Sequence, residues 1–451
     1  MDFAERFRAA LRIKTDWPAG ALPGDAGAEA PLFRFQEFLA EQYPRFHRIA
    51  ERWSLGPYSL IYRWPGSGGS GGGEAEVNPA LVLAHYDVVP VETEKWTADP
   101  FGAELKDGYI YGRGALDMKS ILISIMEGAE NLCAEGFRPR RDIWFAFGGD
   151  EERTGLLGAR KTAQWFAERS LHFSWILDEG TAILENQIAG VDRPLALFGI
   201  EEKGFLSLDL TAVQKPGHAS RPPAVQAVAV LARALHRISK KPFPFRLVPT
   251  AEQFFTRLSG FASGPQAFFM RHARALGPLF FRALAVRPDT AALLHTTVAM
   301  TQLAGSAADN VMPSEARAVI NLRLLQPWTV EQAARRIKKI IRDDRVAVTV
   351  HDMGTNPVPA NPEHTRQSGP GWKEMTAALE AAWPGVPPLV FIMVATTDSR
   401  HYQRLAGGIF RFNPHRLDPD ELSRMHGHDE RISLDNLHRG LEFYTSLFRL
   451  L

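Results

Sequence analysis

Three adjacent carboxylates directly follow a strongly apolar segment of the chain. Residues 143–147 have the length and composition of a buried strand, and Asp150, Glu151 and Glu152 come after only two glycines. Like charges repel one another, and each carboxylate near a core needs a partner. A cation is the simplest partner for such a group. The two glutamates would then divide the work, one holding a metal ion and the other moving protons.

The overall composition excludes several classes of function. The chain has 451 residues, 45% of them hydrophobic and 23% charged, which is enough for two or three globular domains. The formal net charge is only +1, so the charge balance does not predict binding to nucleic acid or to an anionic membrane. The single cysteine, Cys133, excludes an internal disulfide bond. The N-terminal residues lack an apolar signal segment, and no run approaches the roughly 20 apolar residues of a membrane span, so we expect a cytoplasmic protein.

Apolar strands and amphipathic helices alternate in the first part of the chain and again near its end. The pattern predicts strands at 58–64, 80–84, 143–146, 173–177 and 389–394, and helices at 121–132, 155–169 and 371–382. This alternation predicts an α/β fold in which helices cover both faces of a mostly parallel sheet. Ligands bind beyond the carboxyl ends of the strands in such sheets. His85, Asp87 and Asp178 follow strands as Glu151 and Glu152 do, so we expect these five side chains at one site.

The pattern changes near residue 199. The following segments predict strands at 204–213, 296–303, 316–325 and 346–350, and helices at 224–238 and 329–341. The order β-α-β-β-α-β, with a helical insertion after the first helix, is that of a ferredoxin-like α+β domain. We therefore expect a catalytic domain in two parts, residues 1–198 and 355–451, with an inserted lid and dimerisation domain at 199–354.

The insertion at about 241–290 has three interpretations. Pairs of phenylalanines alternate there with arginines. Amphipathic helices packed on the lid, a helix pair at a membrane surface, and a wall for a long acyl chain would all have this composition. The first of these, helices packed on the lid, is the favoured interpretation.

Several site candidates also have an ordinary structural interpretation. Asp87 lies two residues after His85 and so faces the same side of an extended segment, where a carboxylate can orient a metal-bound imidazole. Asp117 precedes a helix and is either an N-cap or a ligand. Asp178 is either a turn residue or a ligand. An ordinary structural role fits the adjacent Glu151 and Glu152 least well, because the repulsion between their negative charges is costly unless a cation is bound.

Five motifs in order resemble those of a known family. They are His-Tyr-Asp at 85–87, Gly-Arg-Gly-Ala-Leu-Asp-Met-Lys at 112–119, Asp-Glu-Glu at 150–152, Leu-Asp-Glu-Gly at 177–180 and His-Gly-His-Asp-Glu at 426–430. In order and rough spacing they resemble the dinuclear-zinc exopeptidase and deacylase family, which includes aminoacylase, glutamate carboxypeptidase and succinyl-diaminopimelate desuccinylase. The resemblance covers nearly the whole chain, the inserted domain included.

Three further stretches resemble one branch of this family. Residues 58–64, 217–223 and 397–402 are similar to the branch that contains the Gly-Xaa carboxypeptidase and the N-fatty-acyl-amino-acid hydrolase/synthase. The resemblance implies an enzyme that binds two Zn²⁺ ions per chain, with Co²⁺ or Mn²⁺ as substitutes. The implied metal ligands are His85, Asp117, Glu152, Asp178 and His426, with Asp117 bridging the two ions and Glu179 as the alternative to Asp178.

The same resemblance implies roles for further residues. Glu151 would be the general base, Asp87 would orient a ligand histidine, and His218 would stabilise the oxyanion. Arg400 would bind the substrate carboxylate, and Asn310 would contact substrate near the oxyanion. The alternatives are a helix-capping loop histidine for His218, a surface ion pair for Arg400 and a turn residue for Asn310.

The expected activity is zinc-dependent hydrolysis of an amide bond with release of a free amino acid. The substrate would be a small peptide or an N-acyl amino acid, as for a carboxypeptidase, dipeptidase or aminoacylase. The alternatives are an N-fatty-acyl-amino-acid hydrolase/synthase with a long apolar acyl pocket, and a non-catalytic binding module, which would be expected to lack the base or a ligand. We expect a homodimer formed through the inserted domain, and the sequence leaves open whether His218 acts in its own subunit or in the partner.

Overall fold

A large mixed sheet forms the centre of the molecule. The structure is a computed structural model that describes residues 1–451 except 19, 69–77, 186, 189 and 352. Within the described residues the sheet has eight strands, in the order β1 (Glu51–Ser54), β2 (Ser59–Trp64), β6 (Ile143–Gly148), β3 (Ala80–His85), β7 (Trp175–Leu184), β16 (Ile409–Leu417), β8 (Leu195–Glu202) and β15 (Pro388–Met393). The pairs β6–β3, β3–β7, β7–β16 and β8–β15 are parallel. The pairs β1–β2, β2–β6 and β16–β8 are antiparallel, so the predicted mainly parallel sheet is confirmed.

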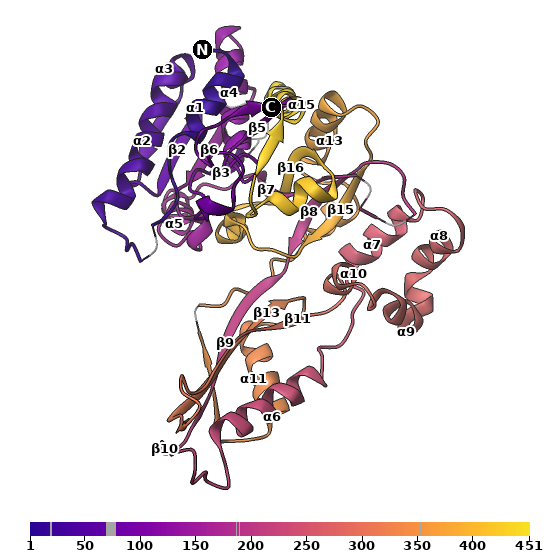
Figure 1. Cartoon of the computed structure of the whole chain (residues 1–451). Helices are drawn as coiled ribbons and strands as arrows, with labels where there is room; N and C mark the ends of the chain where they lie inside the picture. Colours follow the sequence, from indigo (N-terminus) through magenta and orange to yellow (C-terminus); the bar gives the residue numbers. More distant parts are fainter. Residues whose placement is uncertain (19, 69–77, 186, 189, 352) are drawn as a thin grey trace.

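Helices cover both faces of this sheet (Figure 1). On one face lie α4 (Lys119–Ala134), α13 (Trp372–Ala382) and α15 (Leu434–Arg449). On the other lie α5 (Ala159–Glu168) and, at the β15 edge, α7 (Pro249–Leu258). The alternation of side chains along each strand explains this division, because successive residues point to opposite faces.

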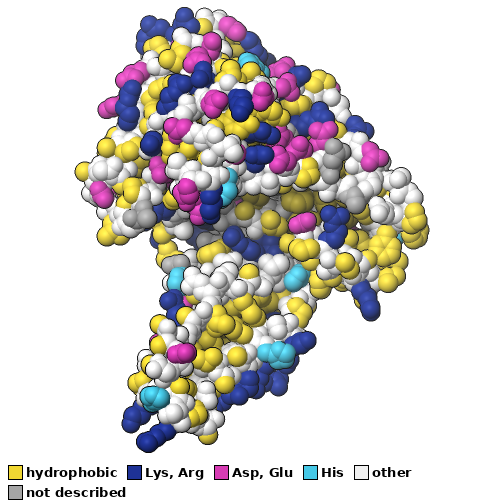
Figure 2. All heavy atoms as spheres, in the orientation of Figure 1, with side chains coloured by type: hydrophobic (Ala, Val, Ile, Leu, Met, Phe, Trp, Pro, Cys, Tyr) yellow, Lys and Arg dark blue, Asp and Glu magenta, His cyan; other side chains and the backbone are white. Residues whose placement is uncertain are grey.

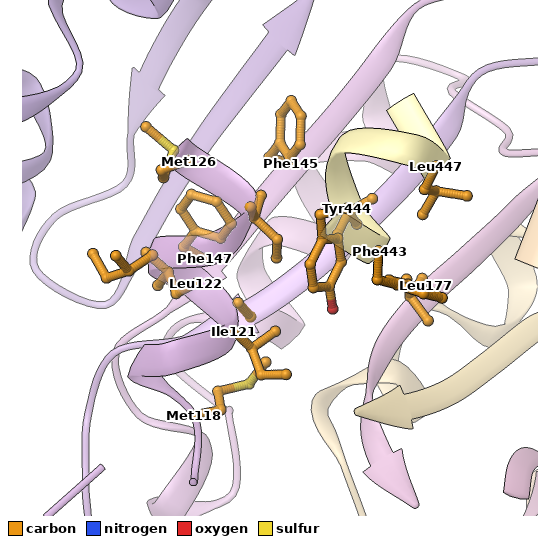
Figure 3. Close-up of a cluster of buried hydrophobic side chains, with 14 of the residues drawn as sticks. Met118, Ile121, Leu122, Met126, Phe145, Phe147, Leu177, Phe443, Tyr444 and Leu447 are labelled. Atoms are coloured by element: carbon orange, nitrogen blue, oxygen red, sulfur yellow. The ribbon is translucent and has the colours of Figure 1, made fainter. Parts of the chain in front are cut away.

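The core on the α4 and α15 face is dense in aromatic side chains. Phe145 and Phe147 of β6 point to this face and pack with Leu122 and Leu447, whereas the intervening residue, Ala146, belongs to the cluster on the α5 side. Figure 3 shows these side chains between the sheet and the two helices. Strands β3 and β6 are buried on both faces, which explains why their sequences are continuously apolar. The packing on both faces also fixes the ends of these strands.

A second sheet belongs to the inserted part of the chain. Its order is β11 (Thr297–Ala304), β13 (Glu315–Leu324), β9 (Gly204–Val213) and β14 (Val346–Val350), and every pair is antiparallel. Helices α6 (Ala227–Ser239) and α11 (Val330–Ile341) pack on one face of it. The predicted capping box of Thr329 and Gln332 starts α11. The ferredoxin-like arrangement is confirmed.

The chain passes between the two sheets at two neighbouring points. Strand β8 ends at Glu202 and β9 begins at Gly204, and the return connection lies beside it, because Glu202 pairs with Val358 and Phe205 with Thr355. A Cβ atom on Gly204 would lie 2.4 Å from the carbonyl oxygen of Thr355, so this close approach requires glycine. The smaller sheet therefore extends away from the larger one on two adjacent connections (Figure 1).

The helical insertion packs on the larger sheet and not on the lid. Helices α7, α8 (Gly264–Arg271), α9 (Ala273–Leu284) and α10 (Pro288–Ala292) form a cluster with Leu197 of β8 and Leu389 of β15. The prediction of amphipathic helices is right, but their expected position on the lid is wrong. The edge strand β15 offers an apolar face that the sequence did not assign to any partner.

Three strands of the larger sheet, β1, β8 and β16, were not predicted, and β7 is longer than expected. Strand β16 has an irregular pattern because Arg411, Asn413 and His415 are buried within it. Strand β7 does not end at Leu177 but continues to Leu184. Asp178 therefore lies within the strand and not after its end.

Shorter elements surround the two sheets. Helices α1 and α3 pack on α4, and α2 lies beside them. The elements are α1 (Phe3–Leu11), α2 (Ala26–Gln42), α3 (Pro44–Ile49), η1 (Thr93–Lys95), β4 (Leu105–Lys106), β5 (Tyr109–Tyr111), α12 (Pro362–Thr365), α14 (Pro419–Arg424) and β17 (Arg431–Ser433). Strands β17, β5 and β4 form a small antiparallel sheet.

The packing of α15 yields a stability prediction. Leu447 is fully buried in the core, so Leu447→Ala should lower the free energy of unfolding by about 2–5 kcal/mol. Leu450, three residues on and 46% exposed, is the matched control, and Leu450→Ala should change stability by less than about 0.5 kcal/mol. Urea unfolding followed by circular dichroism measures both. Equal losses for the two variants would contradict the assigned core.

Candidate metal centre

The first group of candidate ligands gathers around His85 at the end of β3. The buried imidazole has its Nε2 atom 3.0 Å from Oδ1 of Asp117 and 3.5 Å from Oε2 of Glu179. Its Nδ1 atom lies 3.0 Å from the carbonyl oxygen of Asp87 and 3.5 Å from its carboxylate. His85, Asp117 and Glu179 each direct one donor atom to a common point, with these atoms within 4.8 Å of one another.

A second group shares Asp117 with the first. Nε2 of His426 lies 3.0 Å from Oδ2 of Asp117 and 3.2 Å from Oε1 of Glu152. The donor atoms of Asp117, Glu152 and His426 also lie within 4.8 Å of one another. Asp117 thus directs one carboxylate oxygen to each group, as a carboxylate that bridges two cations must.

The electrostatics of the two groups favour a cation. Burial raises the pKa of Glu179 well above its usual range, and the neighbouring Asp117 adds to this shift. Burial likewise raises the pKa of Glu152, and Oε1 of Glu152 is a buried oxygen without a well-aligned hydrogen bond to any described residue. The hydrogen bond to Asp117, together with the close contact with the Glu152 carboxylate, raises the pKa of His426 to about 10. A divalent cation would take the place of the proton that His426 shares with the two carboxylates, and it would reduce the repulsion between neighbouring carboxylates. The donor set therefore fits the implied metal.

Asp87 holds the backbone of Glu151 and Glu152. Its Oδ1 atom accepts the backbone N–H of Glu151 at 3.2 Å, and Oδ2 accepts that of Glu152 at 3.1 Å. The glutamates begin the short helix η2 (Glu151–Arg153), directly after β6. One buried carboxylate thus contacts His85 and also fixes the turn that carries Glu151 and Glu152.

Glu151 lies beside the ligand groups but outside both of them. Burial, together with the negative charges of Glu179 and Asp398, raises its pKa well above the usual range. Nη1 of Arg400 is 4.0 Å from Oε1 of Glu151. A carboxylate that gains protons readily, next to a cation site, is suited to carry protons.

The structure separates Asp178 from Glu179. Oδ1 of Asp178 accepts the N–H of Glu179 at 2.9 Å, and Oδ2 accepts the N–H of Ser399 at 2.7 Å. Both oxygens of Asp178 are therefore engaged by backbone, and Glu179 is the carboxylate that reaches His85. Asp178 had been the expected ligand, with Glu179 as the alternative, and the geometry favours the alternative.

A buried ion pair that the sequence did not reveal joins two ligand loops. Glu430 accepts the N–H groups of Gly114, Leu116 and Asp117 at 2.7–3.1 Å, and Nη1 of Arg113 at 2.7 Å. Arg113 also donates to the carbonyl oxygen of Gly427 at 2.9 Å. The pair thereby fixes the loop that carries Asp117 against the loop that carries the ligand histidine. The only signal in the sequence was the place of Glu430 at the end of a recognised motif.

Asp150, which had no assigned role, has a structural one. Its carboxylate is buried and accepts the N–H groups of Leu157 at 2.7 Å and Gly158 at 2.9 Å. Burial raises its pKa to about 6 in spite of these hydrogen bonds. The residue closes the loop between η2 and α5.

Arg400 lies at the candidate site, but His218 and Asn310 lie far from it. Arg400 is in η3 (Asp398–Leu405) and donates to the carbonyl oxygens of Thr397 at 2.6 Å and Thr154 at 2.7 Å. His218 is in β10 (Gly217–His218), which pairs with β12 (Val311–Met312), and both it and Asn310 are exposed. This pair of short strands lies at the end of the inserted domain remote from the larger sheet (Figure 1).

A cleft opens beside the second ligand group. It has a volume of about 380 Å³, and its lining includes Glu152, Arg153, Trp17, Leu22 and Val88. The cleft is therefore mainly apolar, with a candidate ligand on its wall.

The fold and the site together indicate the class of metal-dependent hydrolases. The fold is an α/β sheet with a ferredoxin-like insertion, and the site consists of two carboxylate–imidazole groups that share one aspartate. The sequence pattern of Peptidase family M20/M25/M40 matches residues 81–450. The chain belongs to this family of metallopeptidases and related hydrolases.

Curated relatives support the same family. The N-fatty-acyl-amino acid synthase/hydrolase PM20D1 of Xenopus tropicalis is 32% identical over 448 residues, which are 99% of this chain and 85% of the relative. The probable carboxypeptidase S-like 2 of Dictyostelium discoideum is 33% identical over 424 residues, 93% of this chain and 80% of the relative.

Solved structures share the fold. An M20 family metallo-carboxypeptidase from Sulfolobus solfataricus superimposes with a TM-score of 0.70 at 16% identity, covering 100% of this chain and 99% of that one. Human carnosine dipeptidase 1 gives a TM-score of 0.67 at 15% identity, covering 99% and 95%.

Paired variants test which carboxylate completes the first group. Glu179→Gln should remove about one equivalent of bound metal per chain, because it takes a donor from the group around His85. Asp178→Asn should retain that metal and weaken its affinity by at most about 10–100-fold, as expected for a neighbour of the ligands. Atomic emission spectroscopy after dialysis and a competition titration provide the readout. Loss of metal from Asp178→Asn alone would reverse the assignment.

Proposed function

We propose that this M20 family hydrolase cleaves the amide bond that joins an acyl or aminoacyl group to an amino acid with a free carboxylate. Its activity would be that of a carboxypeptidase, dipeptidase or aminoacylase. The observation that carries the proposal is the position of Glu151, whose side chain is only 11% exposed, beside both ligand groups and 4.0 Å from a guanidinium. The names of the relatives, which include carboxypeptidases and an N-fatty-acyl-amino acid synthase/hydrolase, support an amide with an amino acid on one side.

Two divalent cations, with Zn²⁺ as the proposed metal, are the proposed cofactors. The proposed ligands are His85 and Glu179 on one side, Glu152 and His426 on the other, and Asp117 between them. When bound, such cations supply Lewis-acid polarisation of a carbonyl group and make water more acidic near neutral pH.

Glu151 is the proposed proton carrier. Asp87 holds the backbone of Glu151, so its carboxylate points from a fixed turn beside both ligand groups. It would accept the proton of the attacking water and later donate it to the leaving amine, because an amine leaves poorly unless it is protonated. The raised pKa of Glu151 suits it to hold that proton between the two steps.

Arg400 and the cleft supply the proposed substrate contacts. The Arg400 guanidinium lies close to Glu151 and presents positive charge where the carboxylate of the released amino acid would bind. The apolar cleft beside Glu152 would accept a side chain or an acyl group. Long-chain N-acyl amino acids are the second candidate substrate, favoured by the similarity to the N-fatty-acyl-amino acid synthase/hydrolase and by the apolar walls of the cleft.

A homodimer through the inserted domain is also proposed. His218 and Asn310 are neighbours, since the N–H of Ala219 donates to the carbonyl oxygen of Asn310, yet both are remote from the metal centre of their own chain. The exposed edge strand β11, with Met300 and Leu303 on its surface, offers an unpaired edge for a second copy. In such a dimer His218 would reach the partner's metal centre and stabilise the oxyanion there.

No helix in the described part of the chain is long and apolar enough to cross a membrane. A cytoplasmic location stays a proposal, based on the near-neutral charge and the single cysteine.

Replacing the proposed base should separate metal binding from turnover. Glu151→Gln is expected to keep the metal content and to lower kcat at least about 100-fold, because the proton carrier is lost while the ligands stay. Chelation should inactivate the parent enzyme, and Zn²⁺ should restore it. Glu168→Gln, on the exposed side of α5, is the matched control and should behave like the parent. A metal-loaded Glu151→Gln with kcat within tenfold of the parent, about 1.4 kcal/mol in barrier, would reject the role.

Mixing two inactive variants tests catalysis across a dimer. His218→Ala and Glu151→Gln should each be inactive alone. After mixing and subunit exchange, about half of the dimers are hybrids, and each hybrid holds one intact site, so about a quarter of the parent activity should return. Activity that stays at the level of the separate variants, with exchange verified by mass spectrometry, would place His218 in its own subunit or outside the site.

A further inference from the structure

A second, larger cavity lies at the opposite side of the larger sheet from the metal centre. It has a volume of about 540 Å³ and is bordered by α7, α8, α9, the edge strand β15 and its neighbour β8. Its walls are mainly hydrocarbon and include Leu197, Phe254, Leu258, Phe269, Phe280 and Phe391. In the strand order, β3, β7 and β16 separate this edge from β6, which carries the proposed base, so the cavity is distinct from the cleft beside Glu152.

The chemistry of the walls selects an apolar ligand. Leu197, Phe255, Leu258 and Phe280 are fully or almost fully buried and supply no hydrogen-bonding side-chain atom. A buried water molecule needs two to four polar partners, so the part of the cavity lined by these four side chains does not hold ordered water well. Polar side chains lie among the lining residues as well, namely Gln187, Gln266, Arg287, Asp289 and Thr290.

The size of the cavity selects the shape of that ligand. A methylene group occupies about the volume of a water molecule, roughly 30 Å³, so the cavity has room for on the order of fifteen of them. We propose that the cavity binds one long hydrocarbon chain of an amphiphile, with the polar head at the rim beside Gln266 and Arg287.

The surface around α8 and α9 fits the entry of such a molecule. Phe268, Leu279 and Val286 are exposed there and are flanked by Arg271 and Arg282. Figure 2 shows apolar and basic side chains together over this part of the molecule. Exposed apolar groups beside positive charge attract the chain and the anionic head of a single-chain amphiphile.

Chain-length dependence is the first test. Displacement of a fluorescent fatty acid by unlabelled saturated fatty acids of about eight to about eighteen carbons, on the metal-loaded protein, gives the affinities. Each additional pair of methylenes should raise affinity on the order of tenfold until the cavity is full, and longer chains should gain nothing more. Affinity that does not depend on chain length would overturn the proposal.

Two matched pairs of variants locate the site. Ala283→Trp fills the cavity from its exposed rim and should weaken binding of the longest chains at least about tenfold, whereas Ala285→Trp, exposed and outside the lining, should not. Phe269→Ser, in the wall, should weaken binding likewise, whereas Phe268→Ser, adjacent but 60% exposed, should not. Equal affinities of Ala283→Trp and the parent would overturn the proposal, and because Ala283 is exposed its replacement leaves the core intact.

Kinetics identify the source of the chain. If the chain belongs to the substrate, Ala283→Trp raises KM for a long-chain N-acyl amino acid and leaves KM for the N-acetyl analogue unchanged. If it belongs to a separate lipid, both KM values stay unchanged while fatty-acid binding is lost. The inference does not depend on the proposed amide hydrolysis, because the binding experiment uses fatty acids, which contain no amide.

Discussion

The cost of burying carboxylates next to one another is the constraint on which this structure depends. An unpaired buried charge costs several kcal/mol, and this site holds many acidic side chains at the apolar end of a sheet. The protein compensates them by different means. Backbone N–H groups serve Asp87, Asp150 and Asp178, and a buried arginine serves Glu430. Among the described residues, the carboxylates of the two ligand groups have mainly imidazoles and one another as neighbours, an arrangement that favours divalent cations.

Two of these compensating contacts also position residues of the candidate site. The carboxylate that accepts the N–H groups of Glu151 and Glu152 is the one beside His85. The ion pair of Arg113 and Glu430 draws together two loops that each carry a ligand. Fixed geometry around a reacting centre is worth more to catalysis than to stability, because it removes the need to reorganise during the reaction. The contacts that compensate the buried charges are therefore also the contacts that fix the geometry of the site.

Much of the fold and site could be predicted from the sequence, and the exceptions have physical reasons. The ferredoxin-like order and the grouping of strand-end carboxylates follow from local patterns, which is why they were predictable. Strand β16 was missed because Arg411, Asn413 and His415 are buried within it, and burial of polar residues depends on partners elsewhere in the chain. The choice between Asp178 and Glu179 depends on strand β7 continuing past both residues. The contact of Arg113 with Glu430 joins residues 317 positions apart, which no local pattern reports.

The buried ion pair of Glu430 has a consequence for biosynthesis. His426 and Glu430 follow Asp117 by 309 and 313 positions, so the loop with Asp117 is synthesised well before the residues that secure it. A nascent chain therefore exposes acidic donors and a single ligand imidazole before the second imidazole and its anchor exist. Its affinity for divalent cations should rise steeply only once residues 426–430 have been made. Metal loading then becomes a check that synthesis has passed Glu430, because a shorter product lacks both the second imidazole and its anchor.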